Sequence, residues 1–213
     1  DKKTIEKEFP SKNVFAVGNS INDSVNQTLE RLKKNKIIDK SNINKGEYIY
    51  CTIHRAENTN NKKRFDRIIK VIKYFSVNFK VIIPVHPRVK KKESFLKSTF
   101  NSNVILTEPL PYSDSLYLLN NCLFCFTDSG GIQEEATSLG VPTLVLREAT
   151  ERTEGVLNKN SKIVGTDTNT IIDTINDLLT KKQSLSDMAV ERNLYGDGTS
   201  SKQIRSIIDQ ALN

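Results

Sequence analysis

The stretch from Leu123 to Glu154, LFCFTDSGGIQEEATSLGVPTLVLREATERTE, decides the fold of this chain. Its first four residues, 123–126, form an apolar run that predicts a buried strand, and Asp-Ser-Gly-Gly at 128–131 predicts a tight turn. The segment 132–139 then predicts a helix that ends at Gly140. A turn of small residues therefore connects the carboxyl end of a strand to the amino end of a helix.

Such a turn favours an anion, because the first backbone N–H groups of a helix lack intrahelical acceptors and the helix dipole adds positive charge. Gly130 and Gly131 let a ligand approach the backbone closely, and Ser129 adds a hydroxyl. A plain capped helix in an α/β unit fits the same pattern. After the next predicted strand, 143–146, charged residues gather in a loop of the kind that binds ligands in α/β proteins: Arg147, Glu148, Glu151, Arg152 and Glu154.

Apolar runs alternate with helical patterns along most of the chain. Further strands are predicted at 13–17, 48–53, 80–85, 104–106 and 162–164, and helices at 21–32, 65–75, 90–99, 113–121 and 168–179, before a helical tail that ends at Leu212. This alternation predicts an α/β fold, a Rossmann-like doubly wound parallel sheet with helices on both faces. We interpret residues 1–12 as a linker, 13–193 as the sheet domain and 194–213 as a carboxyl-terminal segment that packs toward another domain.

Three motifs follow predicted strands: His54-Arg55, His86 and Ser129-Gly130. In a doubly wound sheet the carboxyl ends of all strands meet at one edge, so these residues should lie close together. The spacing therefore predicts one composite site with contributions from three strands.

The composition is that of a soluble globular protein with an excess of positive charge. The 213 residues include 32 Lys+Arg against 25 Asp+Glu, for a net charge of +7, which suits an anionic partner such as a nucleotide diphosphate. The basic run 88–92 is compatible with nucleic acid, but no nucleic-acid-binding motif accompanies it, so we expect no such partner. No apolar run approaches the roughly 20 residues that span a bilayer, and the first ten residues lack a signal-peptide core. We expect a cytoplasmic protein without a membrane partner.

The three cysteines, Cys51, Cys122 and Cys125, form no disulfide framework. The Cys-x-x-Cys spacing at 122–125 corresponds to half of a zinc site or to a redox pair, but no second ligand pair accompanies it. We interpret these residues as small buried hydrophobic side chains and expect no metal site.

Several strings together resemble the non-hydrolysing UDP-N-acetylglucosamine 2-epimerases: TDSGGIQEEA at 127–136, LGVP at 139–142, REATER at 147–152 and TIHRAEN at 52–58. The resemblance implies one of the two Rossmann-like domains of a glycosyltransferase-B-like architecture, namely the carboxyl-terminal, UDP-binding half. It implies UDP-GlcNAc and UDP as ligands, no cofactor, a homodimer, and an amino-terminal Rossmann domain that is missing here and holds the carboxylates that move the sugar proton.

The resemblance also assigns roles to individual residues. It places UDP binding at Ser129, Gly130, Gly131, Glu135 and Arg152, catalysis at His54, and a substrate or regulatory UDP-sugar at Arg55 and His86. Residues 192–198, RNLYGDG, resemble a structural motif of the family in which Leu194 replaces a proline. By contrast, Glu134 is expected to be a solvated carboxylate, and Glu57 is a candidate to hold Arg55.

Ser115 departs from the family, which commonly has a phenylalanine there that stacks on the uracil; Tyr112 and Tyr117 are candidate replacements. Three alternatives to the epimerase remain open at this point. They are an epimerase of a UDP-diacetamido-uronate, a UDP-sugar-binding module without catalysis, and the donor-binding domain of a glycosyltransferase.

Overall fold

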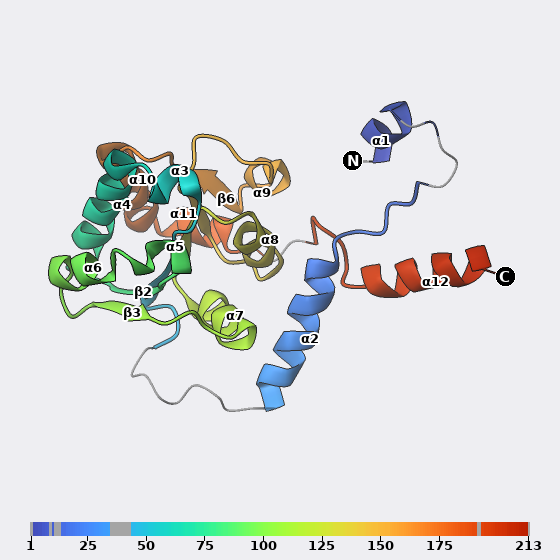
Figure 1. Ribbon diagram of the computed structural model, residues 1–213, viewed down its shortest axis with the longest axis horizontal. Coiled ribbons are helices and arrows are strands. Elements are labelled where there is room, and N and C mark those ends of the chain that lie inside the picture. Colours follow the sequence, from blue (N-terminus) through green and yellow to red (C-terminus); the bar gives the residue numbers. More distant parts are fainter. Residues whose placement is uncertain (1, 9, 11–13, 35–43, 191–192, 213) are drawn as a thin grey trace.

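A six-stranded parallel sheet forms the centre of the computed structural model, which describes residues 2–8, 10, 14–34, 44–190 and 193–212 (Figure 1). Its order is β3-β2-β1-β4-β5-β6, and every neighbouring pair is parallel. The strands are β1 (Tyr48–Thr52), β2 (Lys80–Pro84), β3 (Val104–Thr107), β4 (Phe124–Thr127), β5 (Thr143–Val145) and β6 (Ser161–Ile163). The predicted α/β, doubly wound fold is confirmed.

The chain reverses its direction of travel across the sheet between β1 and β4. It builds outward from β1 through β2 to β3 and then returns to place β4 on the other side of β1, with Thr52 opposite Thr127. Ligands of open α/β sheets bind in the crevice at this switch point, outside the carboxyl ends of the strands. The loops that begin at Ile53 and Asp128 border that crevice.

Helices cover both faces of the sheet (Figure 1). One face packs against α2 (Ser20–Lys34), α7 (Tyr112–Asn121) and α8 (Gly130–Ser138), and the other against α4 (Lys62–Phe75), α6 (Glu93–Thr99), α10 (Thr168–Thr180) and α11 (Lys182–Met188). The short helices α3 (Ala56–Thr59), α5 (Pro87–Lys90) and α9 (Thr153–Leu157) follow β1, β2 and β5, whereas α1 (Lys2–Glu8) and α12 (Ser200–Leu212) lie away from the sheet. None of the described helices has both the length and the apolar character that a membrane span requires.

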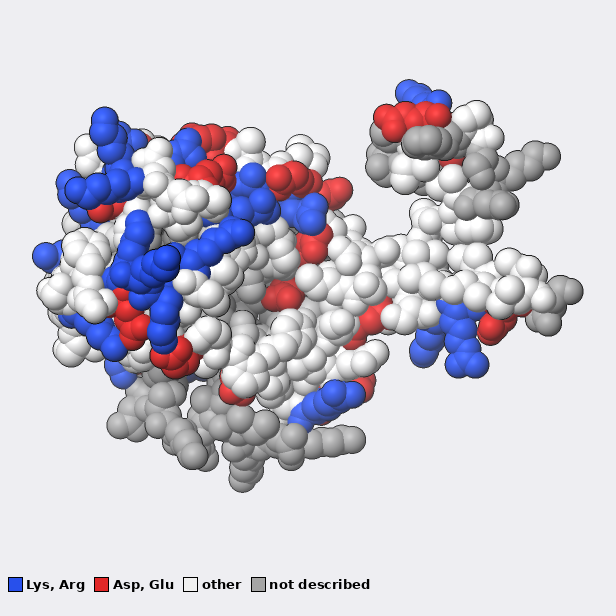
Figure 2. All heavy atoms as spheres, in the orientation of Figure 1, with Lys and Arg blue, Asp and Glu red and all other residues white. Residues whose placement is uncertain are grey.

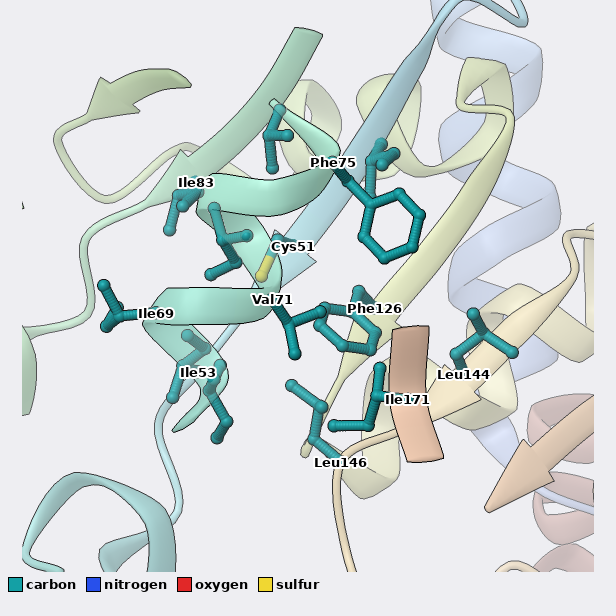
Figure 3. Close-up of a cluster of buried hydrophobic side chains, with 14 of the residues drawn as sticks. Cys51, Ile53, Ile69, Val71, Phe75, Ile83, Phe126, Leu144, Leu146 and Ile171 are labelled. Carbon is teal, nitrogen blue, oxygen red and sulfur yellow. The ribbon is translucent and has the colours of Figure 1, made fainter. Parts of the chain in front are cut away.

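The alternation of side chains along β1 divides the core into two parts. Ile49, Cys51 and Ile53 face the layer that contains α4, whereas Tyr48 and Tyr50 face the layer that contains α7. Figure 3 shows the first part, in which side chains of α4 and α10 meet those of the central strands. The cysteines are free, and Cys51 and Cys125 are fully buried, as expected of small hydrophobic side chains.

Gly130 and Gly131, expected in a tight turn, are already the first residues of α8. Two further predicted elements differ from the structure. The helix expected at 90–99 is divided into α5 and α6, because Pro87 starts α5 early and Lys92 has a non-helical backbone, with φ −103° and ψ 3°. The strand expected at 13–17 is wrong: residues 14–17 pair with no strand, and Phe15 is 56% exposed. An apolar run becomes a strand only where its backbone pairs with another strand, and residues 14–17 pair with neither edge strand, β3 or β6.

Other predictions fall outside the described residues. These are residues 1, 9, 11 and 12 of the expected linker, Asn13 of the expected strand, and Arg192 of the RNLYGDG motif; most of residues 37–47, which we interpret from the sequence as a polar connector, also lie outside.

The described part of that motif closes a junction between α2 and α12. Gly18 and Gly196 both have positive φ, and a Cβ at Gly18 would lie 3.2 Å from the Cα of Gly196. Asp23 caps α12 by accepting hydrogen bonds from the backbone N–H groups of Ser200 (3.2 Å) and Ser201 (2.9 Å). These contacts support the structural interpretation of the motif.

Candidate functional site

A buried carboxylate, Asp128, connects the loops that follow β1 and β4. It is 0% exposed and accepts hydrogen bonds from the backbone N–H groups of His54 (3.0 Å) and Arg55 (3.0 Å) and from Asn58 Nδ2 (3.0 Å). Burial raises the pKa of Asp128, whereas these hydrogen bonds and one from the His54 side chain lower it. The lowering is larger, so the pKa of Asp128 lies below its ordinary value. Asp128 is therefore an ionised group that fixes both loops.

His54 lies at the centre of this arrangement. Its Nδ1 lies 3.2 Å from Asp128 Oδ1, and its side chain remains 31% exposed. The ring of His86 meets it edge to face, with a distance of 5.4 Å between the ring centroids. Burial lowers the pKa of His86, and the neighbouring His54 and Arg88 side chains lower it further, so His86 favours the neutral form. The predicted convergence of the loops after β1, β2 and β4 is confirmed.

The amino end of α8 provides backbone donors beside this cluster. Ser129 is its N-cap, and the Ser129 Oγ accepts a hydrogen bond from the N–H of Ile132 at 3.4 Å. The N–H groups of Gly130 and Gly131 come first in the helix and have no intrahelical acceptor. They are available to an anion.

Two guanidinium groups flank the same point. A Cβ at Gly130 would lie 3.6 Å from Arg55 Nη2 and 3.8 Å from Arg152 Nη2, whereas a Cβ at Gly131 would meet nothing within 4 Å. The space next to Gly130 is therefore bordered by a helix amino end and two permanent positive charges. This combination suits a phosphate or diphosphate group.

Arg152 is held in place by α8. Thr150 Oγ1 donates to Gln133 Oε1 at 2.7 Å and accepts from the N–H of Arg152 at 3.1 Å. The Nε of Arg152 lies 2.5 Å from Glu134 Oε1. The expectation that Glu134 is solvated is wrong: the residue is 6% exposed because α8 turns this side chain inward, where Arg152 meets it. Burial raises the pKa of Glu134, and the charge of Arg152 opposes that shift.

Glu57 does not hold Arg55. Its Oε1 lies 2.9 Å from Arg147 Nε instead, and Arg147 also pairs with Glu151 at 2.7 Å. The pair with Glu57 connects α3 to the loop after β5, and the pair with Glu151 lies within that loop. Among the described residues, no carboxylate lies within ion-pair distance of Arg55, which leaves its charge to the site.

A cavity of about 240 Å³ opens beside the two histidines. The hydroxyl groups of Tyr50 and Ser115 meet there at 2.8 Å. Neither Tyr112 nor Tyr117, the replacements considered for the missing phenylalanine, contributes to the lining. The cavity is lined by Tyr50, Thr52, Ile53, His54, Pro84, His86, Pro87, Pro109, Leu110, Ser115, Ser129 and Ile132.

Glu135 lies apart from the arginines and histidines. It is 7% exposed, receives a hydrogen bond from Tyr112, and lines a separate cavity of about 410 Å³ with Ile21 and Arg31. Burial raises the pKa of Glu135 to about 7. The structure thus brings together His54, Arg55, His86, Ser129, Gly130 and Arg152, with Gly131 in the same helix turn, but places Glu135 on the α2 side of α8.

Sequence reasoning assigned no role to Asp128, Asn58 or Tyr50. A signal for Asp128 is present in the sequence, since an acidic residue follows a run of buried strand residues and precedes the turn. Asn58 and Tyr50 carry no such signal. As to metals, the described residues contain no group of three His, Cys, Asp or Glu side chains arranged to hold an ion.

The fold and the site define a class of protein: a Rossmann-like α/β domain whose switch point carries a helix amino end and two arginines, an arrangement that suits an anion. Residues 1–209 match the family model described as UDP-N-acetylglucosamine 2-epimerase, and the chain belongs to this family.

Individual relatives agree with this assignment. A UDP-N-acetylglucosamine 2-epimerase homolog from Methanococcus maripaludis is 37% identical over 201 residues, which are 92% of this chain and 54% of the relative. The crystal structure of the Neisseria meningitidis UDP-GlcNAc 2-epimerase bound to UDP-GlcNAc superimposes with a TM-score of 0.85 at 34% identity, covering 97% of this chain and 58% of that one. The Methanocaldococcus jannaschii UDP-GlcNAc 2-epimerase in complex with UDP-GlcNAc and UDP superimposes with a TM-score of 0.84 at 32% identity, covering 98% of this chain and 58% of that one. The chain thus spans about half the length of the curated relatives it matches.

Proposed function

We propose that this chain is the UDP-binding half of a UDP-N-acetylglucosamine 2-epimerase, within a two-domain architecture of the glycosyltransferase-B type. The observation that carries the proposal is the position of Gly130, which lies at the amino end of α8 between Arg55 and Arg152. In this proposal the diphosphate of UDP occupies that space, with the Ser129 hydroxyl and the first amides of α8 as donors.

The reaction inverts C2 of UDP-GlcNAc to give UDP-ManNAc by elimination and re-addition of UDP. Breaking the sugar–phosphate bond places extra negative charge on the leaving diphosphate, and Arg55 and Arg152 offset that charge while UDP stays bound. We assign His54, fixed by Asp128, to the sugar side of the cleft, where its exposed face can exchange a proton. His86 contacts the same sugar nucleotide or a second, regulatory copy.

Glu135 and the cavity near Ser115 complete the nucleotide site in this proposal. Glu135 binds the ribose hydroxyls, since a carboxylate accepts two donors. In this proposal the uracil contacts the part of the cavity at Tyr50 and Ser115, and the sugar contacts the part at His54 and His86. The carboxylates that remove and return the C2 proton lie in the part of the relatives that this chain does not span, and we propose a cytoplasmic homodimer as the complete assembly.

Calorimetric titration with UDP, and with uridine as the control, tests the binding proposal. We expect UDP to bind at least tenfold more tightly than uridine, because the diphosphate contacts dominate. Ser129→Ala and Arg152→Ala should each weaken UDP binding without changing uridine binding. Equal affinities for the two ligands, or unchanged UDP affinity in both variants, would disprove the phosphate assignment.

Incorporation of solvent deuterium at C2 of UDP-GlcNAc tests catalysis. The 213-residue chain should bind UDP yet incorporate no deuterium, because the proton-transferring carboxylates are absent from it. Deuterium incorporation by the pure chain would contradict the proposal that the proton-transferring carboxylates lie outside it. Binding of UDP by a complete protein that never exchanges the proton would instead indicate a UDP-sugar-binding module.

A further inference from the structure

A groove of about 740 Å³ runs between α4 and α6, on the outer surface of the helix layer. Its apolar floor contains Phe65, Ile69 and Phe95, and Phe95 is 48% exposed. None of the residues that converge at the carboxyl edge of the sheet contributes to its lining. The groove is therefore a second concave surface, separate from the nucleotide site.

The walls of this groove are basic. In the space-filling view, lysine and arginine side chains gather over the α4 and α6 side of the molecule (Figure 2). The charged lining residues are five lysines and one acid, Asp66; the lysines are Lys62, Lys70, Lys73, Lys91 and Lys92.

The groove lysines have no ionic partner among the residues that the structure describes. In the part of the chain that the structure describes, no carboxylate lies within ion-pair distance of any of the five. The nearby Lys90 and Lys97, which do not line the groove, both pair with Glu93. Lys92 is fixed differently, since its Nζ donates to the Thr59 carbonyl at 2.8 Å and lies 4.2 Å from the Phe65 ring centroid. Lys90 and Lys97 beside the groove are thus paired with a carboxylate, whereas the lysines that line the groove are not paired with any described carboxylate.

The spacing of the charges along α4 matches a helix as the complementary surface. Lys62, Lys70 and Lys73 extend along α4 over about 16 Å, and Lys62 and Lys73 are separated by about three helical turns, which places these two on the same side of the helix. A second helix lying along the groove can place a carboxylate opposite each of them while its apolar side chains contact Phe95 and Ile69. A flat membrane surface would not reach a concave floor.

We propose that this groove docks an acidic amphipathic helix of a partner protein. The apolar face of the partner covers the floor, and its flanking glutamates or aspartates pair with the lysines on both walls. The floor provides affinity mainly through Phe95, whose exposed ring a partner would remove from water, because Phe65 and Ile69 are already buried. The lysines fix the orientation and exclude basic helices. This inference is independent of the function proposed for the nucleotide site.

Fluorescence anisotropy with a labelled model peptide tests the proposal on the 213-residue chain. The probe is a helical peptide of about 18 residues, made of leucine, glutamate and alanine, with leucine on one face and glutamate beside it. We expect saturable binding that weakens as salt is raised, and no binding of the same peptide with lysine in place of glutamate.

Two charge-matched variants decide whether the groove is responsible. Lys70→Glu with Lys73→Glu should weaken binding at least tenfold, whereas Lys63→Glu with Lys162→Glu, outside the groove but equal in net charge, should change it less than about twofold. Phe95→Ala should weaken binding several-fold. Circular dichroism confirms that each variant is folded.

Three results would overturn the proposal. The first is an equal loss in both charge variants, which would show attraction to net charge alone. The second is unchanged affinity in Phe95→Ala, which would exclude the apolar floor. The third is binding of the chain to phosphatidylglycerol vesicles but not to the acidic peptide, which would favour a membrane surface.

Discussion

His54 Nδ1 lies 3.2 Å from Asp128 Oδ1, and the carboxylate of Asp128 is completely buried. Because Asp128 is ionised and acts only as an acceptor, the hydrogen on the neutral His54 ring resides on Nδ1. The lone pair of Nε2 is then available to a ligand. A residue at the end of β4 thus sets the chemistry of a residue at the end of β1.

Replacing Asp128 with asparagine should both destabilise the fold and release His54. The amide NH2 would face backbone N–H groups that now donate to a carboxylate oxygen, leaving buried donors unpaired. We expect a loss of about 2–3 kcal/mol in the free energy of unfolding, measured with urea. Nitrogen NMR of His54 should show a mixture of ring tautomers.

The exposed Asp173 provides the control for that substitution. Asp173→Asn should leave both the unfolding free energy and the His54 spectrum within error of the parent chain. A single unchanged His54 tautomer in Asp128→Asn would show that Asp128 does not orient the imidazole.

The pH dependence of stability should carry a contribution from Glu135. Its pKa is raised by burial to about 7 in the folded chain, above its ordinary value of 4.5 in an unfolded one. Between these values the folded state binds more protons, so Glu135 makes the unfolding free energy fall as pH rises from about 4.5 to 7. Glu135→Gln should remove this part of the slope, on the order of 3 kcal/mol at most.

Urea unfolding at pH 5 and pH 8 measures this effect. The Gln variant should gain stability relative to the parent at pH 8 and show little difference at pH 5. The exposed Glu30 supplies the comparison, since Glu30→Gln should leave the pH slope intact. An identical slope in Glu135→Gln and the parent would mean that Glu135 titrates normally.

The two glycines at the start of α8 should respond differently to a methyl group. Neither has a positive φ, so alanine is compatible with both backbones. At Gly130 the new Cβ enters the space between Arg55 and Arg152, whereas at Gly131 it meets nothing. Gly130→Ala should weaken UDP binding at least tenfold, and Gly131→Ala should change it little.

Both alanine variants should be as stable as the parent or slightly more stable, since alanine is the better helix former. Thermal unfolding checks this, so that lost affinity cannot arise from unfolding. Comparable UDP affinities for the two variants would place the diphosphate elsewhere.

Substitutions at Tyr50 and Ser115 should compensate for each other, because the two side chains share one space. The Tyr50 hydroxyl lies 2.8 Å from Ser115 Oγ, so it fills space that a larger side chain at 115 would need. Ser115→Phe alone should cost about 1–3 kcal/mol in unfolding free energy by overpacking. Combining it with Tyr50→Leu should cost less than the sum of the single changes by about 1 kcal/mol or more.

A double-mutant cycle by urea unfolding measures that coupling. Ser113, on the same helix, offers the control, because Ser113→Phe combined with Tyr50→Leu should give additive effects. Additivity in the Ser115 cycle would show that the two positions do not share the same space.

The stretch from Leu123 to Glu154 shows which structural features can be predicted from the sequence. The predicted strand, the Ser129 cap and the positive φ of Gly140 are all observed, because each depends on residues only a few positions apart. The run at 14–17 has the same local character as a strand but forms none, since a strand also needs a partner strand and this run pairs with none. The local sequence therefore indicates where a strand can form, and pairing with a neighbouring strand decides whether it forms.

By itself, the sequence determined the alternating α/β order, the parallel sheet and the gathering of strand-end residues, because periodicity and turn chemistry are local and parallel strands share one edge. The tertiary structure decided which side chains of distant segments contact one another. Asp128 contacts His54 across 74 positions, Glu134 turns inward to Arg152, and Tyr50 reaches Ser115. Such pairs depend on the register of strands and the rotation of helices packed on them, which side-chain packing throughout the domain sets together.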